Sequence, residues 1–302
     1  MRKILKKLKI LFFLTTLERF PNLFRPKSTP FISGDTFRAK ADHIFDETKT
    51  FNPKKIKFLD LVFLNTDFLE VYFETIHKKI NTKYILITHN SDRSISSSEM
   101  HLADEKIVHW FAQNLCIPEN EKITAIPIGI ENLRRLKNGR KKWFNKKPPV
   151  KKKSILAAFD VYTNYSERNL VIENLKNNVN IDFLKFDSSE EYFNAAKEYR
   201  FILCPPGNGK DTHRIWECLL LGVVPIVKVD EFSSNFFKKG IPILLVDNWG
   251  EINKYDQTEL ENLYNDLCSN PRFFEYSSSK YWLEKIIDFR EKYIFYNQLE
   301  ET

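Results

Sequence analysis

Glycine and cysteine are scarce in this chain, and their scarcity narrows what the chain can be. Only eight of its 302 residues are glycine, so two glycines in one loop are not generic filler. The four cysteines are widely spaced and form no Cys-x-x-Cys pair, which indicates reduced, buried thiols in a reducing compartment and no metal site. The uncharged run 10–17 has eight residues, too few to span a bilayer.

The N-terminal segment 1–24 is basic and has no small-residue cleavage site, so we do not expect a secretory signal. Ile4, Leu8 and Leu11 can share one helical face. Two interpretations stay open: a basic helix that lies on an anionic membrane surface, or a first helix packed on the fold with a solvated charged side.

The overall composition is that of a soluble globular protein. Charged residues make up 29% and apolar residues 42%, and the length suits two domains of ordinary size. The net charge of +7 favours anionic partners, such as nucleotide diphosphates, acidic lipid head groups or nucleic acid.

The most informative segment is 201–227, with the sequence FILCPPGNGKDTHRIWECLLLGVVPIV. It predicts a strand, a loop with Gly207 and Gly209, a helix and a second strand. A tight loop that enters a helix N-terminus directs backbone N–H groups toward an anion. Arg214 would complete a diphosphate site, and Glu217, on the same helical face, could accept hydrogen bonds from sugar or ribose hydroxyls.

This segment resembles the donor-binding signature of exostosin-type glycosyltransferases. The resemblance implies a GT-B architecture, sugar transfer from a nucleotide donor by a single inverting displacement, and a compact bacterial-type member of that family. It is specific over 201–227 and weak elsewhere. The matching residues are Pro205, Gly207, Thr212, His213, Arg214, Trp216, Glu217, Gly222 and Pro225.

The sequence excludes a P-loop, although the run Gly-Asn-Gly-Lys-Asp-Thr resembles part of one. A P-loop needs glycine where Cys204 stands, and Ser or Thr directly after Lys210, where Asp211 stands. The chain also contains no Asp-x-Asp, which argues against the metal-dependent GT-A class of transferases. We therefore expect no metal and no cofactor besides the nucleotide-sugar donor.

Strand and helix patterns alternate on both sides of a lysine-rich stretch, which predicts two sets of parallel βαβ units. We expect an α/β fold of GT-B type, with two Rossmann-like domains that face a central cleft. The lysine-rich stretch would be a linker, either a solvated hinge or a contact for phosphate or lipid. The expected units are the basic N-terminal segment (1–24), an acceptor-side domain (25–140), the linker (141–153), a nucleotide-sugar-binding domain (154–275) and a C-terminal helix that packs back on the first domain (276–302).

The expected elements of the first half are strands at 30–33, 57–64, 84–88 and 123–128, and helices at 68–80 and 107–115. Besides those of segment 201–227, the second half is expected to have strands at 154–159, 181–186 and 243–246, and helices at 167–176, 190–198, 259–269 and 281–296.

On the donor side, polar residues follow the predicted strands, where open parallel sheets bind their ligands. Asn164 either caps a helix or binds the donor, and Arg168 is either solvated or reaches the diphosphate, where it and Arg214 would neutralise the leaving group. His213 either bonds a phosphate oxygen or only begins the helix, and Trp216 either packs or stacks. The predicted donor-binding residues are Asn164, Arg168, Gly207, Gly209, Thr212, His213, Arg214 and Glu217.

On the acceptor side, Asp35, His89 and Asp92 are the candidates for the general base that takes the acceptor hydroxyl proton. Asp35 could instead be a helix N-cap. Arg38 could hold an acidic or phosphorylated acceptor. The family resemblance does not extend to this half of the chain.

Together these patterns predict an enzyme: a metal-independent glycosyltransferase that moves a hexosyl or pentosyl group from a nucleotide sugar to a glycan or lipid-linked glycan, a precursor of surface polysaccharide or lipopolysaccharide. We expect it in the cytoplasm or peripherally on the inner face of an anionic membrane, without a nucleic-acid partner. One alternative is another nucleotide- or phosphosugar-handling enzyme on two Rossmann halves. A second is a non-catalytic basic protein that binds glycans or nucleic acid with steep salt dependence.

Overall fold

The computed structural model describes residues 25–144 and 148–300, which form a mixed α/β fold with two five-stranded parallel sheets. The expected fold class, two Rossmann-like halves of GT-B type, is confirmed; the predicted basic segment 1–24 lies outside the described residues. The strands are β1 (His43–Phe45), β2 (Leu61–Asn65), β3 (Tyr84–His89), β4 (Ile107–Ala112), β5 (Ile123–Ala125), β6 (Lys153–Ala157), β7 (Ile181–Phe183), β8 (Tyr199–Leu203), β9 (Val224–Lys228) and β10 (Leu244–Val246). The helices are α2 (Gly34–Lys40), α3 (Leu69–Thr75), α4 (Tyr165–Leu175), α5 (Ser189–Ala196), α6 (His213–Leu220), α7 (Glu231–Phe237), α8 (Gln257–Cys268) and α9 (Ser279–Glu300).

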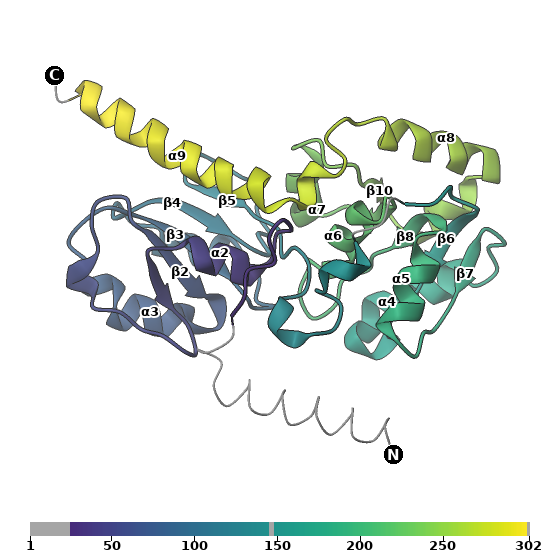
Figure 1. Ribbon diagram of the computed structural model, residues 1–302, viewed down its shortest axis with the longest axis horizontal. Helices are drawn as coiled ribbons and strands as arrows, with labels where there is room; N and C mark the ends of the chain where they lie inside the picture. Colours follow the sequence, from purple (N-terminus) through teal and green to yellow (C-terminus); the bar gives the residue numbers. More distant parts are fainter. Residues whose placement is uncertain (1–24, 145–147, 301–302) are drawn as a thin grey trace, which may run out of the picture.

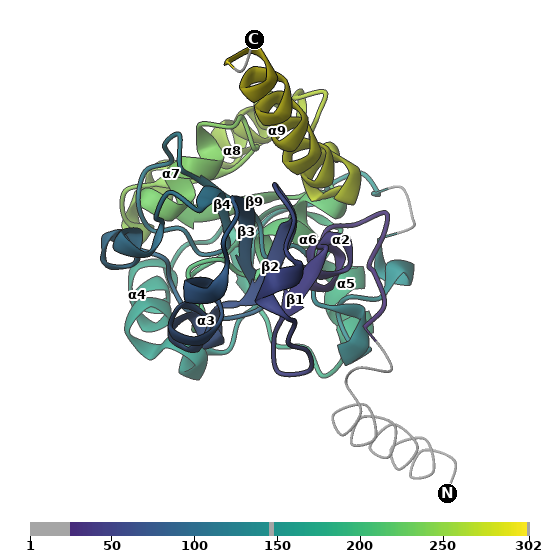
Figure 2. The ribbon, with the colours of Figure 1, turned by 90° about the vertical axis from the view of Figure 1, so that its left-hand side faces the viewer.

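The first sheet has its strands in chain order, β1-β2-β3-β4-β5, and helices cover both of its faces (Figures 1 and 2). Side chains alternate between the faces along β4. Trp110 packs against Phe73 of α3 on one face, whereas His109 and Phe111 pack against Phe289 of α9 on the other. Helix α9, from the C-terminal end of the chain, therefore covers part of one face of the first sheet.

The second sheet has the order β10-β9-β8-β6-β7, so its first strand, β6, lies between its second and third. The chain moves outward from β6 in one direction to β7 and then returns past β6 to β8. Such a reversal is a topological switch point, and open α/β sheets bind ligands beyond the carboxyl ends of the strands at that point. In this molecule the switch point lies between β6 and β8. The predicted donor-binding residues lie in the loops that follow these two strands and in the helices α4 and α6 that those loops enter.

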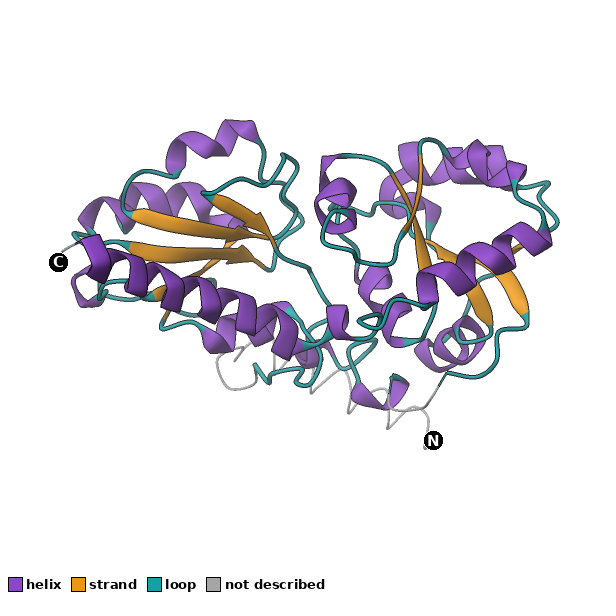
Figure 3. Ribbon diagram, turned by 90° about the horizontal axis from the view of Figure 1, so that it is seen from above, coloured by secondary structure: helices purple, strands orange, loops and turns teal. Residues whose placement is uncertain are grey.

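The two sheets meet through the loops at the carboxyl ends of their strands (Figure 3). The backbone N–H of Ile128, after β5, donates to Asp211 at 2.6 Å, and the N–H of Asp211, after β8, donates to Asn114 at 2.8 Å. Residues that are far apart in sequence thus form one seam between the halves.

Two expected elements of the first half are wrong. The predicted helix 107–115 is strand β4. Ile107–Ala112 lies in the interior of the sheet and is buried on both faces, so it lacks the alternation of apolar and polar residues that marks a strand. The predicted strand 30–33 joins no sheet; Phe31 and Ser33 make single bridges to Ser278 and Gly129, and α2 begins at once. The sequence analysis also missed β1, α2 and α7, and the N-cap of α2 is Ser33 rather than Asp35.

The described part of the predicted linker has exposed lysines and a few packed residues. Trp143 stacks on Phe193 of α5 with ring centroids 5.4 Å apart, and Phe144 packs between Phe193 and Phe31. Lys151 donates to the carbonyls of Lys197 and Leu221, both at 2.9 Å. Within residues 25–144 and 148–300, no helix has the length and apolar character needed to cross a membrane.

Candidate active site

The donor loop, residues 204–212, connects β8 to α6 at the switch point. Two side chains that follow β6, Asn164 at the start of α4 and Arg168 within α4, hold it in place. The side-chain oxygen of Asn164 caps α4 by accepting from the backbone N–H of Glu167. Its Nδ2 donates to the backbone carbonyl of Gly207 at 2.9 Å. Arg168 donates to two backbone carbonyls, from Nε to that of Pro206 at 2.9 Å and from Nη1 to that of Asp160 at 2.6 Å. Burial and then the neighbouring Arg214 lower the pKa of Arg168 to about 10, so it stays charged at neutral pH.

Both glycines of the donor loop stand where a side chain would crowd a neighbour. A Cβ atom at Gly209 would lie 3.0 Å from Nδ2 of Asn114 and 3.2 Å from the Asp92 carbonyl oxygen. A Cβ at Gly207 would lie 3.3 Å from Nη2 of Arg168. Gly209 therefore lets the donor loop pack against the first half, and Gly207 lets the arginine approach the loop.

Among the described residues, several of the buried polar atoms that lack a hydrogen-bond partner lie where the donor loop enters α6. They are Oγ1 of Thr212, Nε of Arg214 and Oε1 of Glu217. Each unsatisfied buried group costs about 1–3 kcal/mol, and such groups call for an explanation in a native fold. A polar ligand that bonds them would supply the missing partners.

The charges at this point influence one another. Burial raises the pKa of Glu217 to about 8, although Arg214 acts in the opposite direction. The pKa of Arg214 is raised even though burial opposes its charged form, because Tyr192, Cys204 and Glu217 lie close to it. At neutral pH the site therefore holds a firmly charged arginine beside a largely neutral carboxyl group.

Trp216, between Arg214 and Glu217 along the chain, is a packing residue. It is fully buried, and its ring packs edge-to-face on Phe236 of α7 and Trp282 of α9. Its indole N–H donates to Asp211 at 2.8 Å. It therefore fixes α6 against its neighbours and offers no face to a ligand.

Asp211 is a residue that the sequence analysis did not single out. Its carboxylate accepts from the backbone N–H of Ile128 and from Trp216, and thereby ties the two halves together. Burial raises its pKa to about 7. Its partners in the first half stand 83 and 97 residues away in sequence, so no local pattern could have revealed this role.

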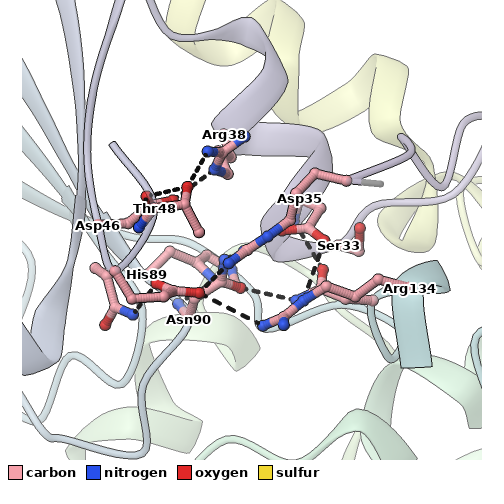
Figure 4. A network of polar contacts seen from close by, with 12 residues as sticks. Ser33, Asp35, Arg38, Asp46, Thr48, His89, Asn90 and Arg134 are labelled. Atoms are coloured by element: carbon pink, nitrogen blue, oxygen red, sulfur yellow. Dashed lines mark hydrogen bonds and ion pairs between the residues drawn. The ribbon is translucent and has the colours of Figure 1, made fainter. Parts of the chain in front are cut away.

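On the acceptor side, Asp35 lies in a network of charges (Figure 4). It is fully buried, receives a hydrogen bond of 3.0 Å from Arg25, and lies 3.5 Å from Nε of Arg134. Its backbone N–H donates to Asn132, which in turn donates to Asn90 at 3.0 Å. The two arginines thus enclose the carboxylate and balance its charge, although its Oδ2 makes no hydrogen bond among the described residues.

His89 has both ring nitrogens occupied. Nε2 must donate, since its partner at 2.9 Å is the carbonyl of Pro127, and Nδ1 therefore accepts from the N–H of Asn90 at 2.6 Å. Burial lowers the pKa of His89 to about 4. No lone pair of this imidazole is available to an acceptor hydroxyl.

Asp92 and Arg38 differ in their surroundings. Asp92 is exposed, and its backbone lies against Gly209 of the donor loop, so the structure brings it to the seam between the halves. Arg38 is buried, and it donates to Asp46 at 2.6 Å and to Thr48 at 2.9 Å (Figure 4). Its guanidinium therefore helps to hold the first half together.

His213 is the residue that joins the donor helix to the acceptor half. It is the first residue of α6, it is half-buried, and its Nδ1 lies 2.7 Å from the carbonyl oxygen of Gly129. Gly129 follows β5, so this hydrogen bond crosses the seam. Burial lowers the pKa of His213.

Solved structures with a similar arrangement include glycosyltransferases. A glycosyltransferase from Rickettsia africae ESF-5 matches with a TM-score of 0.44 and 13% identity, over 77% of this chain and 76% of that one. TarM matches with a TM-score of 0.45 and 11% identity, over 76% of this chain, which spans only about half (54%) of TarM. The spinosyn rhamnosyltransferase SpnG, solved with thymidine diphosphate, matches with a TM-score of 0.35 and 7% identity, over 72% of this chain and 67% of SpnG.

At these identities and scores, the similarity is one of overall arrangement. No protein-family model matches the sequence, and no curated protein matches it. The exostosin-type resemblance of residues 201–227 therefore stays a prediction from the motif.

Proposed function

We propose that this chain is a glycosyltransferase that moves a sugar from a nucleotide sugar to a glycan acceptor. The observation that carries this proposal is the group of unpartnered buried polar atoms of Thr212, Arg214 and Glu217 at the switch point of the second sheet. A diphosphate with attached sugar and ribose hydroxyls offers the matching chemistry. The exostosin-type motif assigns the same residues to the donor.

The diphosphate would lie at the start of α6. Arg214, with the Thr212 hydroxyl and the first N–H groups of the helix, would bind its oxygens, and Arg168 would add a second positive charge through the donor loop. Glu217, largely neutral at pH 7, can both donate to and accept from hydroxyl groups of the sugar or ribose. Two arginines would stabilise the charge that develops on the leaving diphosphate, without a metal.

The acceptor we propose is a lipid-linked glycan precursor at an anionic membrane surface. The segment after β5 carries exposed basic side chains beside the seam between the halves. They would attract anionic head groups or phosphates of the acceptor. These residues are Arg135, Lys137, Lys141 and Lys142.

Binding of UDP, dTDP and GDP tests the donor site, measured by thermal shift and by titration calorimetry. A ligand at about 100 times its dissociation constant should add about 2.7 kcal/mol of stability. We expect one nucleotide to stabilise the protein with and without EDTA, and Arg214→Met to weaken its binding by about tenfold or more. Arg272→Met, which removes an exposed arginine of the same half, controls for the change in net charge.

Failure of all three nucleotides to bind the wild-type protein would overturn the proposal. Binding without any sugar transfer would favour another nucleotide-handling enzyme on the same fold. Equal losses in Arg214→Met and Arg272→Met would show that only overall charge matters, as in a non-catalytic basic protein.

A further inference from the structure

We propose that His213 is the general base of the sugar transfer, and that its Nε2 takes the proton of the acceptor hydroxyl. The inference rests on the proposed function and replaces the phosphate-binding role that the sequence suggested for this residue. It follows from how the imidazole is held, from what surrounds it, and from the state of the other candidates.

The hydrogen bond to Gly129 fixes both the tautomer and the direction of the ring. A carbonyl oxygen only accepts, so Nδ1 carries the proton and Nε2 carries the lone pair. Gly129 itself is rigidly placed: it has φ of +68°, and a Cβ atom there would lie 2.3 Å from the carbonyl oxygen of Ile32. Among the described residues, none forms a hydrogen bond with Nε2 of His213.

Two carboxylates and two basic groups face the ring. Burial lowers the pKa of His213, the hydrogen bond to Gly129 and the carboxylates of Glu131 and Asp92, from the loops after β5 and β3, raise it, and Arg135 lowers it. His89, whose own pKa burial lowers to about 4, also lies near the ring and is neutral at pH 7. Glu131 is held in place by the N–H groups of Asn138 and Gly139. The imidazole is thus neutral at rest, with two carboxylates nearby that would stabilise the imidazolium.

Consecutive residues of α6 face the two halves. His213 bonds to the first half, whereas Arg214 lies beside Tyr192 and Glu217 of the second. A donor bound by Arg214 would therefore place its anomeric carbon between the arginine and the histidine, with the acceptor approaching from the first half. That arrangement suits a base rather than a second phosphate ligand.

The other candidates are less suited. Asp35 is enclosed by Arg25 and Arg134, and both nitrogens of His89 are engaged in the fold. Asp92 remains accessible, and its position beside His213 fits a group that stabilises the imidazolium.

The step is a direct displacement. A lone pair of the acceptor hydroxyl oxygen forms the new bond to the anomeric carbon while Nε2 removes the hydroxyl proton. The bond from the anomeric carbon to the phosphate oxygen breaks, and its electron pair leaves with the nucleoside diphosphate. The imidazolium then releases the proton to solvent.

Two substitutions at this position separate the possible roles. In His213→Asn, the amide N–H can replace Nδ1–H toward Gly129, but no basic nitrogen remains; in His213→Gln, a polar group reaches the position of Nε2 without basicity. Hydrolysis of UDP-, dTDP- and GDP-sugars, with water in place of the acceptor hydroxyl, gives the rate, and titration of the matching nucleoside diphosphate gives its Kd. His101→Asn is the matched control, because exposed His101 also bonds a carbonyl, that of Ser98, through Nδ1 at 2.7 Å.

We expect both His213 variants to lose about 10²- to 10⁴-fold in kcat with less than about twofold change in nucleoside diphosphate Kd, and His101→Asn to match the wild type. In the wild type, kcat should decrease with falling pH, with a midpoint below about pH 6.5, and this decrease should be absent from the variants. The ¹⁵N shifts of the imidazole should show Nδ1 protonated and Nε2 free.

Several results would overturn the inference. His213→Asn with wild-type kcat would leave only the bond to Gly129 as the role of His213. A loss of nucleotide affinity as large as the loss of rate would make it a phosphate ligand. A wild-type protein that binds a nucleotide sugar but hydrolyses none would also count against the base, whereas one that binds no nucleotide removes the proposed function itself.

Discussion

The two halves of the molecule differ in how far their buried charges are paired. In the first half, the Asp35 carboxylate lies within ion-pair distance of Arg25 and Arg134, and both ring nitrogens of His89 are engaged in the fold. In the second half, the half-buried Arg214 and the buried Glu217 have no ion-pair partner among the described residues. Buried atoms without a hydrogen bond occur in both halves, Oδ2 of Asp35 among them, so it is the pairing of charge that distinguishes the two sets of residues.

The order of the strands also differs between the two halves. The first sheet runs in chain order and has no switch point, and it depends on α9 from the far end of the chain to cover one face. The second sheet has its switch point between β6 and β8, directly beneath the donor loop. The first half therefore depends on α9 for the cover of one face, and the candidate site of the second half contacts Gly129 and Asp92 of the first.

The largest expected effect breaks the connection that α9 makes. Trp282 is fully buried between Trp216 of α6 and Phe236 of α7, just before α9 crosses to the first half. Trp282→Ala should lower the free energy of unfolding by about 3–5 kcal/mol. Urea unfolding measures the loss, and hydrogen exchange should report faster opening in both halves.

Phe289→Ala is the matched variant in the middle of the same helix. Phe289 is half-buried and touches His109 and Phe111 of β4, so its loss should be smaller and confined to the first half. Faster exchange in α6 and α7 of Phe289→Ala would contradict the idea that α9 serves the halves through separate contacts.

The second largest effect tests whether the acceptor-side network is structural. Asp35→Asn removes the negative charge that pairs with Arg25 and Arg134 in a buried setting. We expect a loss of about 2–4 kcal/mol in stability, because one partner of a buried ion network is uncompensated. Nucleotide affinity should not change, which titration with UDP, dTDP and GDP would show.

Asp92→Asn makes the same chemical change at an exposed position of this half, so its stability should stay close to that of the wild type. If the Asp35→Asn variant were as stable as the wild type but inactive, Asp35 would be the better candidate for the general base.

A smaller effect concerns the seam. The Asp211 carboxylate accepts two N–H groups, whereas the amide of Asp211→Asn can accept from only one and presents its own donors to the other. We expect a loss of about 1–3 kcal/mol, measured at pH 8, where the wild-type carboxylate is charged. Full stability in this variant would show that the seam is held elsewhere, for example through Asn114.

The donor loop could be predicted from the sequence because its strand, loop and helix are contiguous within residues 201–227. The helix expected at 107–115 was wrong because a strand buried on both faces has no polar alternation, and the sequence contains no signal for the neighbours that bury it. The seam and the Asp35 network were beyond prediction, since their partners are separated by up to 97 residues and meet only when the sheets form.

Glu217→Gln makes the same carboxylate-to-amide change as Asp35→Asn, but we expect it to raise the stability of the fold at high pH rather than lower it. Because the folded-state pKa of Glu217 is raised to about 8, the folded state holds a proton that the unfolded chain releases near pH 4.3, about its ordinary pKa, so wild-type stability falls as pH rises between those values. Glu217→Gln removes this loss. It should unfold at the same temperature as the wild type near pH 4 and be more stable by on the order of 1 kcal/mol at pH 9, while nucleotide-sugar binding weakens. Thermal unfolding between pH 4 and pH 9 measures the gap, and a variant less stable than the wild type at pH 9 would place Glu217 with the structural residues, where Asp35 belongs.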